Sequence, residues 1–109
     1  MKLIFICSPF SGGIEINTLR ASRYCRFAYI KGHVPYAPHL HNPQFLDELI
    51  PEERENGIKL GLEMLKHCDE LWCFGGTLTK GMEVELNFAF HNGIPIKYFS
   101  EKCEEIIVD

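Results

Sequence analysis

The sequence predicts an α/β protein in which helices cover both faces of a parallel sheet of four to five strands. Short apolar runs without polar alternation, such as Leu3–Cys7 and Leu71–Phe74, are typical of strands that are buried on both faces. Segments with apolar residues at helical spacing separate these runs, and alternating strands and helices indicate parallel pairing. A length of 109 residues fits a single domain, residues 1–109.

The first half of the chain is expected to form two strands, one long helix and an irregular segment. Its elements follow as a strand at Lys2–Cys7, a loop at Ser8–Gly13, a helix capped by Asn17 and ended by Gly32, and a strand at His33–Tyr36. Asparagine is a favoured N-cap, and glycine commonly ends a helix. Residues 39–51 contain Pro43 and Pro51 and are expected to be irregular, with one helical turn near Phe45–Leu49.

The second half adds two helices and two or three strands. They are expected as a helix that begins at Pro51, a strand at Leu71–Phe74, a glycine-bearing loop at Gly75–Gly81, a helix at Met82–His91, a strand at Ile94–Phe99 and a short strand at Glu105–Val108. Proline suits a helix start, and Ile58, Leu62 and Leu65 form the expected buried stripe. The elements together predict a three-layer, Rossmann- or flavodoxin-like sandwich. Ligands of such folds bind beyond the carboxyl ends of the strands.

Composition and charge exclude several classes of protein. A net charge of -4 argues against binding of a nucleic-acid polymer, which requires a basic face. No apolar stretch is long enough for a membrane span or a signal-peptide core. The five cysteines include no CxxC pair, so neither a disulfide framework nor a zinc ribbon is expected, and a reducing cytoplasm is the expected location.

The loop Ser8–Gly13 is the first candidate ligand site. Glycines and serines that follow a buried strand can turn backbone amides toward an anion. The loop is neither a Walker A nor a GxGxxG motif, and the alternative is a plain connection between strand and helix. Its candidate phosphate- or ligand-binding residues are Ser8, Pro9, Phe10, Ser11 and Gly12.

The second candidate is the loop that leads into the helix at Met82–His91. Its candidate ligand residues are Gly75, Thr79, Gly81 and Met82. The first turn of a helix offers free N–H groups to a phosphate. Glu83 and Glu85 flank the apolar stripe of Met82, Leu86, Ala89 and Phe90 about equally, so the pattern does not choose between them. The alternative is that both are solvated acids favoured by the helix dipole.

Two further positions stand out. His39 and His41 form an HxH pair, but no third potential ligand lies at a spacing typical of a metal-binding motif. No metal site and no cofactor are therefore expected. His39 follows the second strand and is instead a candidate ligand contact. Gly61 lies on the inward stripe of its helix, which indicates either a close approach of another segment or space kept for a ligand.

These motifs together resemble the nucleoside 2-deoxyribosyltransferase-like superfamily, including small bacterial and phage-type members. The strongest match is Thr79-x-Gly81-Met82-x-x-Glu85-Leu86-x-x-Ala89, which Gly93-Ile94-Pro95 follows. The run Ile4–Gly12 and the helix-to-strand step Cys68–Gly75 are also similar to that superfamily. The resemblance extends from Lys2 to about Phe99.

The resemblance implies an enzyme that acts on a nucleoside or nucleotide. The superfamily includes transferases that move 2-deoxyribose between bases and hydrolases that cut the N-glycosidic bond of 2′-deoxynucleoside 5′-monophosphates. In both, a glutamate attacks C1′, and the motif assigns that role to Glu85 rather than Glu83. The resemblance also implies that Thr79, the Gly81 region and the first loop hold the 5′-phosphate, and that His39 lies near the base.

One departure from the family opens an alternative. Family enzymes carry an aspartate eight residues before the position of Asp69, and here that residue is Gly61. General acid catalysis typically contributes about 10²–10⁴-fold in rate. The alternative is therefore a module that binds or sequesters a nucleotide-derived ligand without chemistry. A single chain of this length is too small to enclose a nucleotide on all sides, and Phe88 is expected to project outside the apolar stripe of its helix. A homodimer or larger homo-oligomer is therefore expected.

Overall fold

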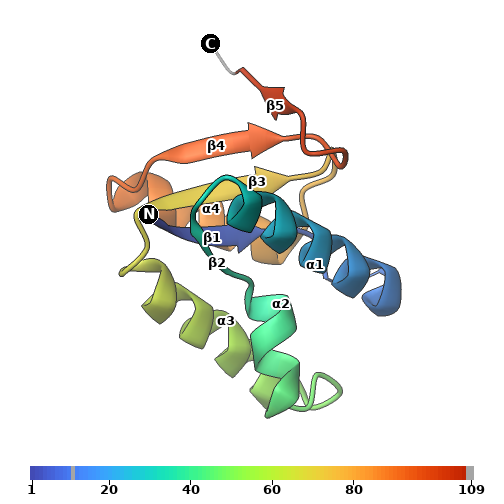
Figure 1. The fold of residues 1–109 in the computed structure, drawn as a ribbon. Coiled ribbons are helices and arrows are strands. Elements are labelled where there is room, and N and C mark those ends of the chain that lie inside the picture. The colour runs from blue at the N-terminus through green and yellow to red at the C-terminus, as the bar shows by residue number, and fades with distance from the viewer. Residues whose placement is uncertain (11, 108–109) are drawn as a thin grey trace.

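The computed structural model describes residues 1–10 and 12–107, which form a five-stranded sheet with helices on both faces (Figure 1). The strands are β1 (Leu3–Cys7), β2 (Val34–Tyr36), β3 (Glu70–Phe74), β4 (Ile96–Phe99) and β5 (Glu105–Ile106). The helices are α1 (Ile14–Ile30), α2 (Pro38–His41), the 3-10 turn η1 (Asn42–Gln44), α3 (Pro51–Leu65) and α4 (Lys80–His91). The predicted three-layer α/β sandwich is thereby confirmed.

The order of the strands places a ligand-binding edge at the ends of β1 and β3. The sheet runs β2-β1-β3-β4-β5, with β1 to β4 parallel and β5 antiparallel to β4. The chain therefore moves from β1 to one side, to β2, and then crosses to the other side, to β3. This reversal is the topological switch point at which ligands bind in open α/β sheets. At this edge, Cys7 of β1 lies opposite Cys73 of β3.

Alternate residues of the central strands build two separate cores. Ile4 and Ile6 of β1 face α1, where they pack in one cluster with Tyr24 and Ala28. On the other face, Phe5 and Cys7 of β1 belong to a second cluster, whose other buried members are Leu65, Cys68, Leu71, Cys73, Met82 and Ala89. Figure 1 shows α1 on one side of the sheet and α4 on the other. This second core supports the site.

The start of α1 differs from the prediction that Asn17 caps the helix. The helix begins at Ile14, because Gly12 and Gly13 take positive φ angles of 83° and 134° that turn the chain at once after β1. Asn17 instead lies buried in the first turn, where its Nδ2 donates a hydrogen bond to the carbonyl of Phe10 at 3.0 Å. The predicted cap is wrong, and the amide of Asn17 closes the loop.

The segment after β2 also differs from the prediction. The helical turn expected near Phe45–Leu49 lies earlier, at α2 and η1, because Pro38 occupies the first turn of α2. The following loop is nevertheless held in place. The amide of Asp47 donates to Glu53 Oε1 at 3.0 Å, and the amide of Leu49 donates to Asp47 Oδ1 at 2.9 Å. The loop is thereby fastened to the first turn of α3.

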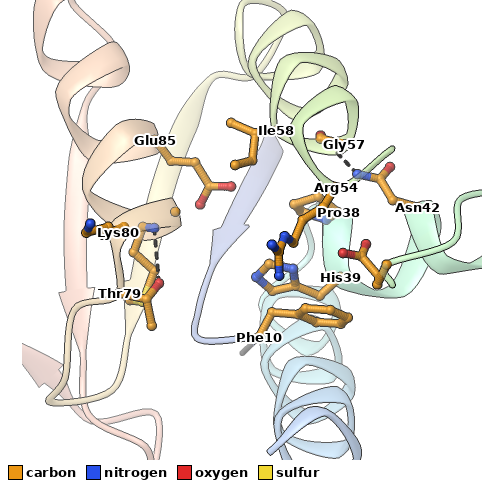
Figure 2. Close-up of a pocket in the computed structure, with 13 residues that line it drawn as sticks. Phe10, Pro38, His39, Asn42, Arg54, Gly57, Ile58, Thr79, Lys80 and Glu85 are labelled. Carbon is orange, nitrogen blue, oxygen red and sulfur yellow. Dashed lines mark hydrogen bonds between the residues drawn. The ribbon is translucent and has the colours of Figure 1, made fainter. Parts of the chain in front are cut away.

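The buried faces of α3 and α4 are displaced from the predicted stripes. On α3, Ile58 is 37% exposed, whereas the buried residues are Gly57, Gly61 and Leu65. On α4, Phe90 is 75% exposed, and the buried residues are Met82, Glu85 and Ala89. Phe88, expected outside the stripe, packs partly against the second core. The buried faces of α3 and α4 are turned toward the space between these two helices, and the side chain of Glu85 projects into that space (Figure 2).

The last strand is shorter than predicted in the part that the structure describes. It covers Glu105–Ile106, and Val108 of the predicted strand lies outside the described residues.

Within the described ranges, no helix combines the length and the apolar character that a membrane span requires.

Candidate active site

A pocket of about 340 Å³ opens at the carboxyl end of β1, between α4 on one side and α2 and α3 on the other (Figure 2). Its volume falls in the range of about 300–1,000 Å³ that is usual for small-molecule sites. The α4 side is lined by Thr79, Lys80, Gly81, Met82 and Glu85. The opposite side is lined by Phe10, by Pro38, His39 and Asn42, by Glu48, and by Arg54, Gly57 and Ile58 of α3.

Glu85 is the buried acid of this pocket. Its side chain reaches from α4 toward Ile58 of α3 (Figure 2), and only 6% of its surface is exposed. Its Oε1 atom is buried and has no hydrogen-bond partner among residues 1–10 and 12–107. Burial raises the pKa of Glu85 to about 8, although the neighbouring thiol of Cys7 lowers it. At neutral pH most of the free protein therefore carries an uncharged Glu85.

Glu83 has a different environment, although it belongs to the same turn of the sequence motif. Its side chain is exposed and does not line the pocket. The sequence pattern placed both acids equally far from the centre of the expected apolar stripe. In the structure the buried face of α4 is rotated toward Glu85, which is buried together with Met82 and Ala89. The geometry thus separates two residues that the periodicity alone did not.

Two buried cysteines, Cys7 and Cys73, interact electrostatically with Glu85. The neighbouring thiol of Cys73, together with burial, raises the pKa of the Cys7 thiol, whose Sγ donates a hydrogen bond to the carbonyl of Met82 at 3.9 Å. A thiol with a raised pKa is neutral at physiological pH, and a neutral thiol is a hydrogen-bond donor. The thiol of Cys7 lowers the pKa of Glu85, which requires that its S–H turn from the carbonyl of Met82 to the carboxylate of Glu85.

The start of α4 forms an anion-attracting end of the pocket. Thr79 is the N-cap, and its Oγ1 accepts a hydrogen bond from the amide of Met82 at 3.3 Å. The amide of Glu83 donates to the carbonyl of Thr79 at 3.0 Å, so among the described residues the amides of Lys80 and Gly81 are left to bind a ligand. The helix dipole places partial positive charge there. Lys80 is exposed and also lines this wall. Phosphate groups bind readily in such a setting.

Phe10 and His39 form an aromatic floor opposite α4. Their rings stack with centroids 4.7 Å apart and planes 25° apart. The Nε2 of His39 donates a hydrogen bond of 2.7 Å to the carbonyl of Ser8, which fixes the orientation of the ring. Burial lowers the pKa of His39, against the opposing effect of that hydrogen bond. His39 is therefore held neutral, with Nδ1 as an acceptor.

The remaining residues proposed from the sequence do not reach the pocket wall. Among the described residues of the first loop, Phe10 lines the pocket, whereas Ser8, Pro9 and Gly12 do not. The side chain of Ser8 is buried, and Pro9 lies against Gly75, which is also outside the pocket lining. Ser11 lies outside the described residues. The structure thus brings together Phe10, His39, Thr79, Gly81, Met82 and Glu85.

Three charged residues of the pocket were missed by the sequence analysis. Lys80 was passed over as part of a loop, and Glu48 belongs to a segment without periodicity. Burial raises the pKa of Glu48, and the positive charge of Arg54 partly opposes this shift. For Arg54 a signal did exist, because it lies in the first helical turns of α3 after Glu52 and Glu53, where the dipole disfavours a cation.

Gly61 is buried in α3 and does not line the pocket. A Cβ atom added at Gly61 would lie 3.8 Å from the Cβ of Pro38 and 3.9 Å from the Cζ of Phe5, which are ordinary contacts. An alanine side chain would fit here, so neither a close approach of another segment nor the volume of the pocket requires a glycine at position 61. Gly57, one turn earlier, is joined to η1 by a hydrogen bond of 3.1 Å from Asn42 Nδ2 to its carbonyl.

Comparison with known proteins gives a family and a fold. A family model described as "Domain of unknown function (DUF7768)" matches residues 2–99. No curated protein matches the sequence significantly. Among solved structures, the 2-deoxyribosyltransferase of the psychrotolerant bacterium Bacillus psychrosaccharolyticus is similar, with a TM-score of 0.74 and 23% identity over 98% of this chain and 77% of that one.

Two further solved structures are similar. The 2-deoxyribosyltransferase of Leishmania mexicana has a TM-score of 0.68 and 19% identity, over 92% of this chain and 65% of that one. The CMP N-glycosidase of Clostridium botulinum has a TM-score of 0.57 and 19% identity, over 91% of this chain and 69% of that one. The fold implied by the sequence resemblance, that of the 2-deoxyribosyltransferases, is therefore confirmed.

Proposed function

Since the chain belongs to the DUF7768 family over residues 2–99, and since its fold is that of the 2-deoxyribosyltransferases, we propose that it cleaves the N-glycosidic bond of a nucleoside or nucleotide. The observation that carries the proposal is Glu85, a buried carboxyl group that points into a pocket of ligand size and has an oxygen without a partner among the described residues. A carboxyl group held at such a cost in desolvation is typical of a functional site.

The proposed reaction has two steps at C1′ of the sugar. As the bond to the base breaks, positive charge develops at C1′, and the ionised carboxylate of Glu85 stabilises this charge and then bonds to C1′. The bonding electrons of the broken bond leave with the base. In the second step, a water molecule attacks C1′, the bond between C1′ and Glu85 breaks, and the proton lost by the water neutralises the departed base, which gives hydrolysis. Attack by a second base instead of water gives transfer.

The remaining walls of the pocket support a nucleotide rather than a free sugar. Thr79, Lys80 and Gly81 surround the start of α4 and suit a 5′-phosphate. Phe10 and His39 offer stacked rings to the planar parts of the ligand. In this arrangement the phosphate lies at the start of α4, and Glu85 lies one turn further along the same helix. The sugar, whose C1′ must reach Glu85, would then lie between the phosphate and the wall formed by α2 and α3.

The decisive experiment is an assay for free base with a panel of 2′-deoxynucleosides and their 5′-monophosphates. The wild-type protein should release base, and Glu85→Gln should lower the rate by several orders of magnitude. Glu83→Gln is the matched control, since it removes the same charge from an exposed side chain of the same helix. It should leave the rate nearly unchanged. Equal losses in both variants would contradict the assignment of the nucleophile.

A second function is favoured by one observation. Gly61 stands where the related enzymes carry an acid, and its surroundings are filled by Pro38 and Phe5. Without that acid the base leaves less well protonated, and the pocket would bind a nucleotide-derived ligand without cleaving it. Calorimetry distinguishes the two functions, because this alternative requires binding of a monophosphate without release of base. In both functions the monophosphate should bind more tightly than its nucleoside.

A further inference from the structure

The wall of the pocket opposite α4 carries two opposite charges with no role in the proposed chemistry. Glu48 comes from the loop before α3, and Arg54 comes from the first turns of α3. Both line the same pocket as Glu85. Figure 2 shows Arg54 across the pocket from Thr79 and Lys80, near His39.

Hydrogen bonds hold the backbone of the segment that carries Glu48 and Arg54. The amide of Asp47, next to Glu48, donates to Glu53 Oε1, and the amide of Arg54 donates to the carbonyl of Ile50 at 3.0 Å. The loop and the start of α3 are thus joined on both sides of Pro51. The backbone that carries both side chains is therefore already ordered, so less conformational entropy is lost when a ligand binds.

The proposed function fixes how a nucleotide would lie in the pocket. With the phosphate at the start of α4 and C1′ beside Glu85, the base would extend toward the opposite wall, which carries Glu48 and Arg54. Arg54 is poorly suited to hold the phosphate, because the neighbouring carboxyl group of Glu48 opposes an anion there.

We propose that Glu48 and Arg54 read the edge of the base and select one that carries both an exocyclic amino group and a carbonyl oxygen, namely cytosine or guanine. This inference rests on the proposed function. A carboxylate accepts hydrogen bonds from an amino group, and a guanidinium group donates to a carbonyl oxygen. Uracil and hypoxanthine lack the amino group, and adenine lacks the carbonyl oxygen.

The test is the binding of 5′-monophosphates, measured by calorimetry on the uncleaving Glu85→Gln protein. The informative ligands are two pairs that differ by the amino group: dCMP with dUMP, and dGMP with dIMP. In at least one pair the amino-bearing member should bind about tenfold or more tightly, as expected for a well-formed hydrogen-bonded contact to a base. Adding Glu48→Gln should reduce this ratio to nearly one. Adding Glu55→Gln, which changes an exposed acid outside the pocket lining, should preserve it.

A second variant keeps the inference testable if Glu48→Gln disturbs the loop. Arg54→Gln should weaken both members of the preferred pair equally, because both carry the carbonyl oxygen, and so should leave their ratio unchanged. Equal binding within both pairs, or a ratio that survives Glu48→Gln, would overturn the reading of the base. Such a result would leave the proposed reaction intact if the wild-type protein still releases base. A lack of binding by all four nucleotides at millimolar concentration would overturn the proposed function and this inference together.

Discussion

Replacing Glu85 by glutamine should make the protein more stable, and the gain should depend on pH. The pKa of Glu85 is about 8 in the folded chain and 4.5 by its ordinary value. Between these two values the folded state keeps a proton that the unfolded state releases, so the stability of the wild type falls as the pH rises across this window. At about 1.4 kcal/mol per pH unit, the loss reaches about 3 kcal/mol at pH 7 and about 5 kcal/mol once the pH exceeds 8. Glutamine has nearly the same shape and does not ionise.

Urea unfolding of the two proteins at several pH values measures this effect directly. Glu85→Gln should match the wild type near pH 4.5 and exceed it by about 3 kcal/mol at pH 7, which corresponds to a rise in Tm on the order of 10 °C. Glu83→Gln is the control, because that side chain is exposed, and it should lose up to about 1 kcal/mol of interaction with the helix dipole. A stability difference between Glu85→Gln and wild type that stays constant from pH 4.5 to 9 would refute the burial argument.

Four further outcomes are expected. In the proposed reaction, kcat/KM should rise with pH through about 8, because only the ionised carboxylate of Glu85 attacks C1′; a flat profile would exclude this titration. Cys7→Ala should move that midpoint to higher pH, since the thiol lowers the pKa of Glu85, and a midpoint that stays in place would contradict its role. Gly61→Ala should fold normally and gain up to about 1 kcal/mol in urea unfolding, because the added Cβ makes only ordinary contacts; a loss would mean that the helix is packed more tightly. Exposed apolar side chains on α1 and α4 favour a homodimer or larger assembly, which light scattering tests against a 12.6 kDa monomer.

The sequence was sufficient for the sheet because its central strands carry an unmistakable signal. Leu3–Cys7 and Leu71–Phe74 are apolar on both faces, and only a buried strand suits such a run. The loops that follow them end at the same edge of a parallel sheet, so the position of the site followed from topology. Glu85 followed from the resemblance of its motif, and the structure adds that it is buried in the pocket.

What the sequence could not provide are arrangements that depend on the tertiary structure. Asn17 has the local preference of an N-cap, but two glycines with positive φ start the helix earlier and give its amide another partner. Ile58 has the spacing of a core residue, yet a pocket occupies the place where a core would be. Glu48 and Arg54 line the same pocket only because the loop between them is bonded back to the start of α3, and no periodic pattern encodes that arrangement.

The direction of the central strands has a practical use in binding experiments. β1 starts at the edge of the sheet opposite the pocket, and Met1, just before it, is 94% exposed. Attachment to a sensor surface at this edge of the sheet would therefore leave the carboxyl ends of the strands, where the pocket lies, facing the flowing solution. Immobilisation through lysines would be less suitable, because Lys80 lies in the pocket wall and coupling there would block the entrance.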